Sequence, residues 1–184
     1  MRLAPLPVAA AWQHVDARSG FEVLFPAPGV LEGHTTAVED GAIWAVSYRI
    51  ELDPGWHTIR ADVTGRSPSG TRTIRLERTD GDRWTVDGMA VPELDGCADV
   101  DLESSAVTNT LPIHRAEFPP GEPVPCPAAY VRADLNVQRL EQIYTAHAPG
   151  RFGYVSPAFD FAAELRYDEA GLIVDYPGIA RRVA

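Results

Sequence analysis

Reactive side chains concentrate in the segment from Gly96 to Arg115. Asp99 and Asp101 lie there with only Val100 between them. Side chains alternate along a β-strand, so in a strand both carboxylates project from one face, about 7 Å apart. A pair of carboxylates at that distance could hold a divalent cation or act as a general acid and base.

The residues around the two aspartates do not complete a metal or catalytic site. Glu103 is the one further acidic residue close by, and the five histidines are scattered without the spacing of metal ligands. No glycine-rich phosphate loop accompanies the Asp-x-Asp triplet, and no serine has the setting of a nucleophile elbow. We therefore predict no metal, no cofactor and no catalytic residue, and we expect the strand face to be hydrogen-bonded.

The polar run from Thr108 to Thr110 is followed by a proline. Short hydroxyl and amide side chains close turns, and Pro112 disfavours a helical conformation at Leu111. Proline also cannot donate to a sheet ladder. We therefore predict an extended segment at a sheet edge or bulge. Bulges are frequent beside binding sites, which makes Asn109 a candidate ligand contact, with a purely structural turn as the alternative.

Aromatic residues offer a second kind of contact. The four tryptophans lie in different segments, and each is expected in the core of a β-rich domain. Aromatic faces also stack on sugars and acyl chains, so we keep Trp84 as a candidate ligand contact.

Composition limits the classes of protein that fit. The 184 residues suffice for one domain with a hydrophobic core. Sixteen basic and 26 acidic residues give a formal net charge of −10, which argues against nucleic acid as a partner. No apolar stretch approaches the ~20 residues that span a bilayer. Cys97 and Cys126 are expected to stay reduced, and the interrupted apolar run at the N-terminus is a poor signal peptide, so we predict a cytoplasmic protein.

Alternating apolar residues predict a series of short strands. In residues 44–52 every second side chain is apolar, and residues 57–63 repeat the pattern with Ile59 beside Ala61 on the apolar face. The turn sequence Asp-Pro-Gly at residues 53–55 separates the two runs, as in an antiparallel meander. The fold class predicted from these patterns is all-β.

The segment 134–146 is ambiguous. Its apolar residues fit a helical stripe, whereas Leu140, Gln142 and Tyr144 would share one face of a strand. Nearer the C-terminus, residues 168–171 form a good four-residue connection for a hairpin.

Short motifs, taken in order along the chain, resemble the putative glycolipid-binding family, formerly a bacterial domain of unknown function. The central motifs are "GCADVDL" at 96–102 and "TNTLPIHR" at 108–115. Further matches are Trp12 with "GFE" at 20–22, "WTVDG" at 84–88, "EQIY" at 141–144 and "GLIVDYPG" at 171–178. The chain departs from the family at Ser105–Ala106, where a Thr-Pro pair is usual, so we expect a less rigid loop there.

The resemblance implies curved antiparallel sheets that form a spiral β-roll around an apolar cavity. It favours strand over helix for residues 134–146. We assign residues 1–11 to an N-terminal tail and residues 12–184 to a single β-roll domain.

The function we predict is non-enzymatic binding of a lipid or glycolipid in the β-roll cavity. The predicted ligand contacts are Asp99, Asp101, Asn109, Arg115, Trp84, Gln142 and Tyr144. One alternative is an enzyme that acts on a sugar or lipid through Asp99 and Asp101, with or without a metal. Another is a structural or protein-interaction domain with no small ligand. The oligomeric state stays open, with a homodimer among the alternatives.

Overall fold

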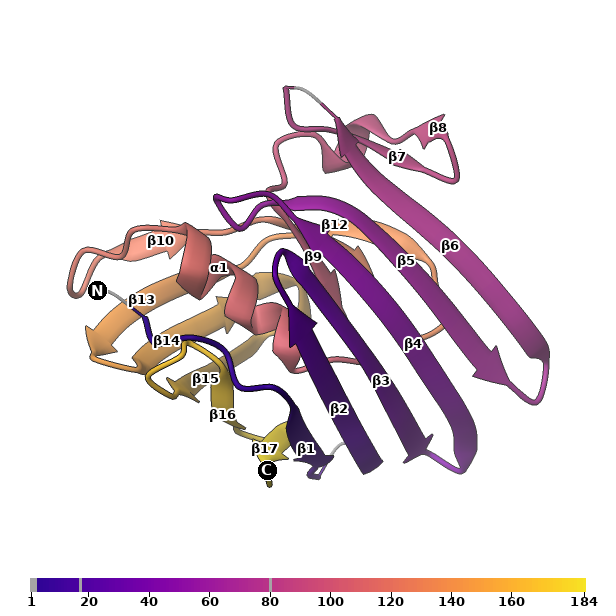
Figure 1. The fold of residues 1–184 in the computed structure, drawn as a ribbon, viewed down its shortest axis with the longest axis horizontal. Coiled ribbons are helices and arrows are strands. Elements are labelled where there is room, and N and C mark those ends of the chain that lie inside the picture. Colours follow the sequence, from indigo (N-terminus) through magenta and orange to yellow (C-terminus); the bar gives the residue numbers. More distant parts are fainter. Residues whose placement is uncertain (1–2, 17, 80) are drawn as a thin grey trace.

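The structure is a computed structural model that describes residues 3–16, 18–79 and 81–184. Strands joined by tight turns make up most of it (Figure 1). The first half contains β1 (Ala10–His14), β2 (Ser19–Ala27), β3 (Val30–Glu39), β4 (Ala42–Leu52), β5 (Thr58–Ser67), β6 (Gly70–Thr79), β7 (Arg83–Val86), β8 (Met89–Ala90) and the 3-10 helix η1 (Pro92–Leu94). The second half contains β9 (Asp99–Leu102), η2 (Val107–Asn109), α1 (Thr110–Arg115), β10 (Pro123–Pro125), β11 (Ala128–Val131), β12 (Val137–Leu140), β13 (Ile143–Ala148), β14 (Arg151–Ser156), η3 (Pro157–Phe159), β15 (Phe161–Tyr167), β16 (Ile173–Tyr176) and β17 (Ala180–Arg182).

Within the described residues, fourteen strands form one antiparallel sheet with its edges at β10 and β8. The pair β17–β1 joins the C-terminal strands to the N-terminal ones. A smaller sheet consists of β12, β11 and β9, and its β11–β9 pair is parallel. In Figure 1, α1 lies between strands β13–β16 and strands β2–β4, so the long sheet curls around the segment that carries the reactive side chains. The predicted all-β fold of curved antiparallel sheets is confirmed.

The N-terminal meander follows the predicted alternation with one exception. Val46 and Ile50 of β4 point into the core, as expected. Ile59 was expected in the core and is instead 44% exposed. A β-bulge shifts the register of β4 and β5 so that Leu52 pairs with Thr58, which takes the buried position. The extra residue of a bulge inverts the alternation locally, and a two-residue period in the sequence cannot show this.

The segment after β9 is helical, so the predicted extended edge is wrong. η2 runs into α1, and Asn109 precedes the first helical residue of α1. Pro112 lies in the first turn of this six-residue helix. Amides of a first turn have no acceptor within the helix, so proline loses nothing there by lacking an N–H. Pro112 disfavours a helical backbone at Leu111, but the burial of residues 110–113 outweighs this preference.

Two regions of the second half agree with the sequence. The ambiguous residues 134–146 contain β12 and part of β13, which confirms strand over helix. The hairpin at 168–171 connects β15 to β16, and the Asp168 carboxylate accepts hydrogen bonds from the amides of Ala170 and Leu172.

The N-terminal segment is attached to the sheet. β1 begins at Ala10, inside the stretch that the sequence assigned to a tail, and pairs with both β2 and β17. Further upstream, the Ala4 amide donates to the carbonyl of Glu169 at 2.8 Å.

The core between the sheet layers is large and aromatic. Trp12 and Trp84 are almost completely buried, and Cys97 and Cys126 are buried free thiols. None of the helices in the described ranges has the length and apolar character needed to cross a membrane.

Candidate functional site

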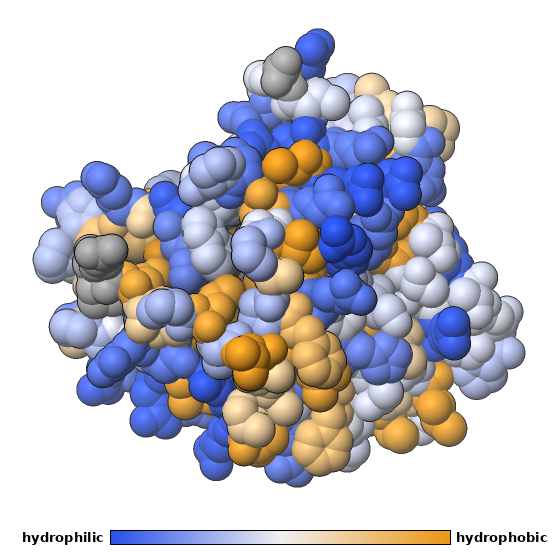
Figure 2. Space-filling model, in the orientation of Figure 1, coloured by the Kyte–Doolittle hydropathy of each residue, from blue (hydrophilic) through white to orange (hydrophobic). Residues whose placement is uncertain are grey.

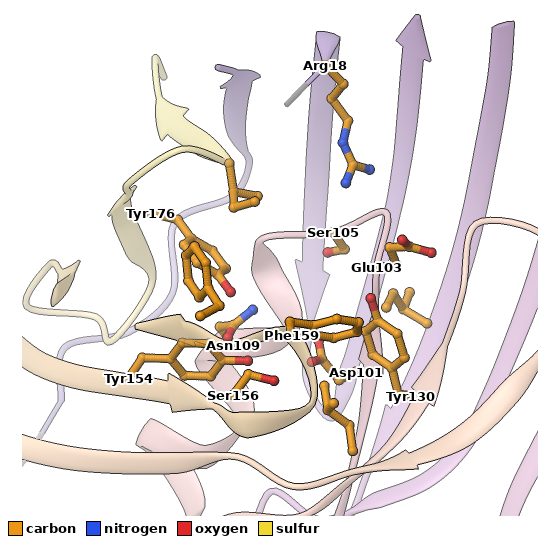
Figure 3. Close-up of a pocket in the computed structure, with 14 residues that line it drawn as sticks. Arg18, Asp101, Glu103, Ser105, Asn109, Tyr130, Tyr154, Ser156, Phe159 and Tyr176 are labelled. Atoms are coloured by element: carbon orange, nitrogen blue, oxygen red, sulfur yellow. The ribbon is translucent and has the colours of Figure 1, made fainter. Parts of the chain in front are cut away.

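A cavity of about 220 Å³ is lined by the small sheet, η2 and strands β14–β16 (Figure 3). Five aromatic side chains contribute to its wall: Tyr130, Tyr154, Phe159, Phe161 and Tyr176. Its polar lining consists of Arg18, Asp101, Glu103, Ser105, Asn109 and Ser156. The cavity thus combines flat apolar faces with hydrogen-bonding groups, a combination that binding sites for small organic molecules share.

Asp101 faces this cavity with both carboxylate oxygens already hydrogen-bonded. Thr108 donates its hydroxyl to Oδ1 at 2.6 Å, and Gln142 donates its amide to Oδ2 at 2.5 Å. Burial raises the pKa of Asp101 to about 6, and these two hydrogen bonds oppose the rise. The carboxyl therefore anchors the cavity wall to the link between β12 and β13.

Asn109 extends the same network on the other side of Gln142. The Tyr144 hydroxyl lies 2.8 Å from Asn109 Oδ1 and 3.1 Å from Gln142 Oε1, so one proton is shared between two acceptors. The Tyr167 hydroxyl donates to the Asn109 carbonyl at 3.1 Å. With its oxygen held from behind, Asn109 turns its amide nitrogen towards the cavity (Figure 3).

Asp99 belongs to a separate ion pair. Arg115 donates from Nε to Asp99 Oδ1 at 3.0 Å and from Nη2 to Oδ2 at 2.7 Å. Burial raises the pKa of Asp99, and the guanidinium of Arg115 opposes that rise. The pair ties α1 to β9. Neither residue lines the cavity.

A buried carboxyl from β2 holds the loop between β9 and η2. Glu22 accepts hydrogen bonds from the hydroxyls of Tyr48 and Ser105 and from the Ala106 amide. Burial raises its pKa to about 7, against the effect of these hydrogen bonds. A proline at position 106 could not donate this hydrogen bond, so the Ala106 amide anchors the loop to β2. Gly33 leaves room for this network, because a Cβ there would lie 2.2 Å from the Tyr48 ring.

The structure brings together four of the seven predicted contacts. Asp101 and Asn109 line the cavity, and Gln142 and Tyr144 stand behind them in one hydrogen-bonded network. Trp84 lies elsewhere in the core, where its indole donates to the Cys97 carbonyl at 2.9 Å.

Sequence reasoning missed most of the lining. Alternation in β14 would have placed Tyr154 and Ser156 on one inward face, which was a usable signal. The Ser156 hydroxyl is buried without a hydrogen-bond partner in the described part of the chain. Arg18 carried no signal, because it lies in a short connection far from the dense segment. Within the described residues no cluster of three or more potential ligands could hold a metal ion.

Comparisons with known proteins point to one family. The family model described as "Putative glycolipid-binding" matches residues 9–182. Among solved structures, the chain is similar to a DUF1089 family protein from Pseudomonas aeruginosa, determined by crystallography at 1.80 Å resolution. The two share 31% sequence identity with a TM-score of 0.83, and the match covers 100% of this chain and 97% of the other. A search of curated proteins gives no match.

Proposed function

Because the chain belongs to the putative glycolipid-binding family, we propose that it binds a glycolipid without transforming it. The sugar head group occupies the cavity, and the acyl part lies at its mouth. The observation that carries this proposal is the cavity wall, where five aromatic rings surround polar side chains that include Asn109 and Ser156.

The size of the cavity selects the part of the ligand that enters. The cavity volume is about 220 Å³. Sites for drug-sized ligands are larger, about 300–1,000 Å³. The cavity therefore suits one sugar ring rather than a lipid tail.

The chemistry of the wall fits a sugar. Aromatic rings pack against the C–H faces of a pyranose, while amide and hydroxyl groups hydrogen-bond its hydroxyls. Asn109 offers a fixed donor because Tyr144 holds its oxygen. Tyr154 keeps its hydroxyl neutral, since burial raises its pKa far above neutral pH.

The mouth of the cavity offers an apolar surface for the rest of the ligand. Phe159 lines the cavity and is 47% exposed, with its ring against Tyr130 at 5.6 Å between centroids. An acyl chain that leaves the cavity past Phe159 would cover apolar area that water now contacts.

The engagement of Asp99 and Asp101 supports binding without catalysis by these two residues. Asp101 has both oxygens engaged by Thr108 and Gln142, and Asp99 is held by Arg115. A general acid or base needs a free oxygen within reach of the substrate. The alternative enzyme built on these two aspartates therefore lacks support from the geometry.

Titration with octyl β-D-glucoside below its micellar concentration tests the proposal. We expect saturable heat of binding in isothermal titration calorimetry and a one-to-one adduct in native mass spectrometry. Ser156→Leu fills the cavity from within and should abolish both signals. Val155→Leu, on the outward face of the same strand, is the matched control and should keep them.

Two results would contradict this function. The protein could bind no alkyl glycoside at all, which would favour an interaction domain without a small ligand. Alternatively, Ser156→Leu could bind as tightly as the unaltered protein while remaining folded by circular dichroism, which would place binding outside the cavity.

A further inference from the structure

Arg18 is a cation buried at the cavity. It directly precedes β2, and its side chain is only 5% exposed. Figure 3 shows the guanidinium extending into the space above Ser105 and Glu103. A guanidinium stays charged in a protein, so it cannot adapt to burial by losing its proton.

The hydrogen-bonding groups of Arg18 are largely unused. Its Nε and Nη1 atoms are buried and have no hydrogen-bond partner in the ranges that the structure describes. The carboxylate of Glu39 lies 3.6 Å from Nε, beyond hydrogen-bond distance, and the Trp44 ring lies 5.1 Å from the guanidinium carbon. These neighbours moderate the charge but leave the N–H groups unsatisfied, a costly state for a buried charged group.

The neighbour on β1 adds no negative charge. Both ring nitrogens of His14 are buried, and the backbone of Ile179 lies beside the imidazole. Burial and the charge of Arg18 lower the pKa of His14 to about 4, which leaves the imidazole neutral. His14 therefore adds no charge beside Arg18, whose ion-pair neighbour is the Glu39 carboxylate at 3.6 Å.

The cavity also contains a carboxylate with spare capacity. Glu103 accepts a hydrogen bond from the Ala133 amide at 2.7 Å through Oε2, which leaves Oε1 able to accept another. Arg18 and Glu103 form no ion pair within 4.0 Å. The two groups thus present a donor region and an acceptor region to a single occupant.

We propose that the cavity selects an anionic head group, a hydroxylated ring that carries a carboxylate, phosphate or sulfate. The anionic group accepts the N–H bonds of Arg18, and ring hydroxyls donate to Glu103 and accept from Asn109. An oxyanion matches the planar fork of a guanidinium, which is the strongest hydrogen-bonding geometry available to arginine. This inference rests on the proposed function, since it specifies which head groups the same cavity takes.

A matched pair of ligands tests the charge alone. Octyl β-D-glucuronide differs from octyl β-D-glucoside only in having a carboxylate in place of the hydroxymethyl group. We expect the unaltered protein to bind the glucuronide about tenfold or more tightly, as one charge-assisted pair implies. Screening should reduce this preference when salt is raised.

Variants of Arg18 test whether this residue causes the preference for octyl glucuronide. In Arg18→Met the affinity ratio of the two ligands should fall to near one, and in Arg18→Lys it should be partly retained. Arg181→Met, at a side chain that is 68% exposed, is the control and should leave the ratio unchanged. Thermal melts establish that each variant is folded. If Arg18→Met is not folded, Arg18→Lys and the salt dependence of the unaltered protein decide.

The outcomes separate this inference from the proposed function. Binding of neither octyl compound would end both. Equal affinity for the two ligands, or a preference that survives in Arg18→Met, would overturn the anionic head group and leave glycolipid binding intact.

A third measurement uses free glucuronate, which has no alkyl chain. If free glucuronate binds more weakly than octyl glucuronide, the anionic group belongs to a lipid head group. If the two bind equally well, the ligand is a soluble sugar acid, which contradicts glycolipid binding but not the anionic head group.

Discussion

Two largely buried arginines of this protein differ in what surrounds them. Arg115 has its charge matched by Asp99, with hydrogen bonds from Nε and Nη2. Arg18 is more deeply buried, at 5% against 16% side-chain exposure, yet its Nε and Nη1 have no partner among the described residues. The first arginine completes the fold and the second faces a cavity. The two arginines therefore share burial and differ in whether their N–H groups have hydrogen-bond acceptors.

Removing the partner of Arg115 should have the largest effect on stability. Asp99→Ala leaves a buried guanidinium unpaired, which typically costs 3–5 kcal/mol. Urea unfolding followed by circular dichroism would measure the loss. Glu164→Gln breaks the pair of Glu164 with Arg151, both 40% exposed or more, and should cost below about 1 kcal/mol. Equal losses in the two variants would show that the Asp99–Arg115 pair is not structural.

The buried carboxyl of Glu22 is the acidic counterpart of the two buried arginines. Its pKa is raised from 4.5 to about 7, so the folded state binds the proton more tightly than the unfolded state. The stability gained is complete below pH 4.5 and is lost as the pH rises to about 7, by roughly 3 kcal/mol. Asp101, raised from 3.8 to about 6, acts in the same direction.

Urea unfolding at a series of pH values across this window checks the effect. Glu22→Gln keeps the shape of the side chain but cannot titrate, so its stability should depend less on pH than that of the unaltered protein. If Glu22→Gln keeps the same pH profile, the pH dependence of stability comes from other groups.

The network behind the cavity should show an intermediate effect. Tyr144→Phe removes one hydroxyl and leaves Asn109 Oδ1 and Gln142 Oε1 without its proton. Loss of a buried hydrogen bond of this kind costs about 1–3 kcal/mol. The variant should also weaken octyl glucoside binding, because Asn109 is no longer oriented. Unchanged affinity would mean that Asn109 does not contact the ligand.

Arg18 should show the smallest effect, and it is the sharpest test of the comparison. Replacing Arg18 by an apolar side chain of similar length removes buried N–H groups that lack acceptors in the described part of the chain, and it leaves the partly exposed Glu39 carboxylate to water. We expect Arg18→Met to unfold at the same or a higher urea concentration than the unaltered protein in the absence of ligand. A loss as large as that of Asp99→Ala would show that Arg18 has a structural partner and that its charge is not reserved for a ligand.

Much of the fold could be predicted because local rules governed it. Alternation and turn residues located β4, the meander around it and the hairpin at 168–171. Predictions from alternation and from proline preferences were wrong where contacts with distant residues changed the local conformation. The bulge opposite Leu52 exposed Ile59, and burial on several sides stabilised a helix at Pro112 that its neighbour restriction disfavours.

The site was only partly predictable. Two polar residues of the dense segment, Asp101 and Asn109, line the cavity, whereas Asp99 and Arg115 do not. Their roles could not be read from one segment. Asp99 and Asp101 sit two residues apart on one strand, yet one meets Arg115 of α1 and the other meets Gln142 beyond β12. Each role depends on which distant element packs against it.

By itself, the sequence determined most of the strands, the family and the segment where reactive side chains gather, because these depend on periodicity, turn chemistry and ordered motifs. Only the tertiary structure decided which polar groups are satisfied and which face a cavity. Hydrogen-bond partners come from residues far along the chain, as Glu22 and Ser105 do. The packing that satisfied Asp99 and Asp101 left Arg18 Nε and Nη1 without a hydrogen-bond partner among the described residues, and the proposed anionic ligand rests on this difference.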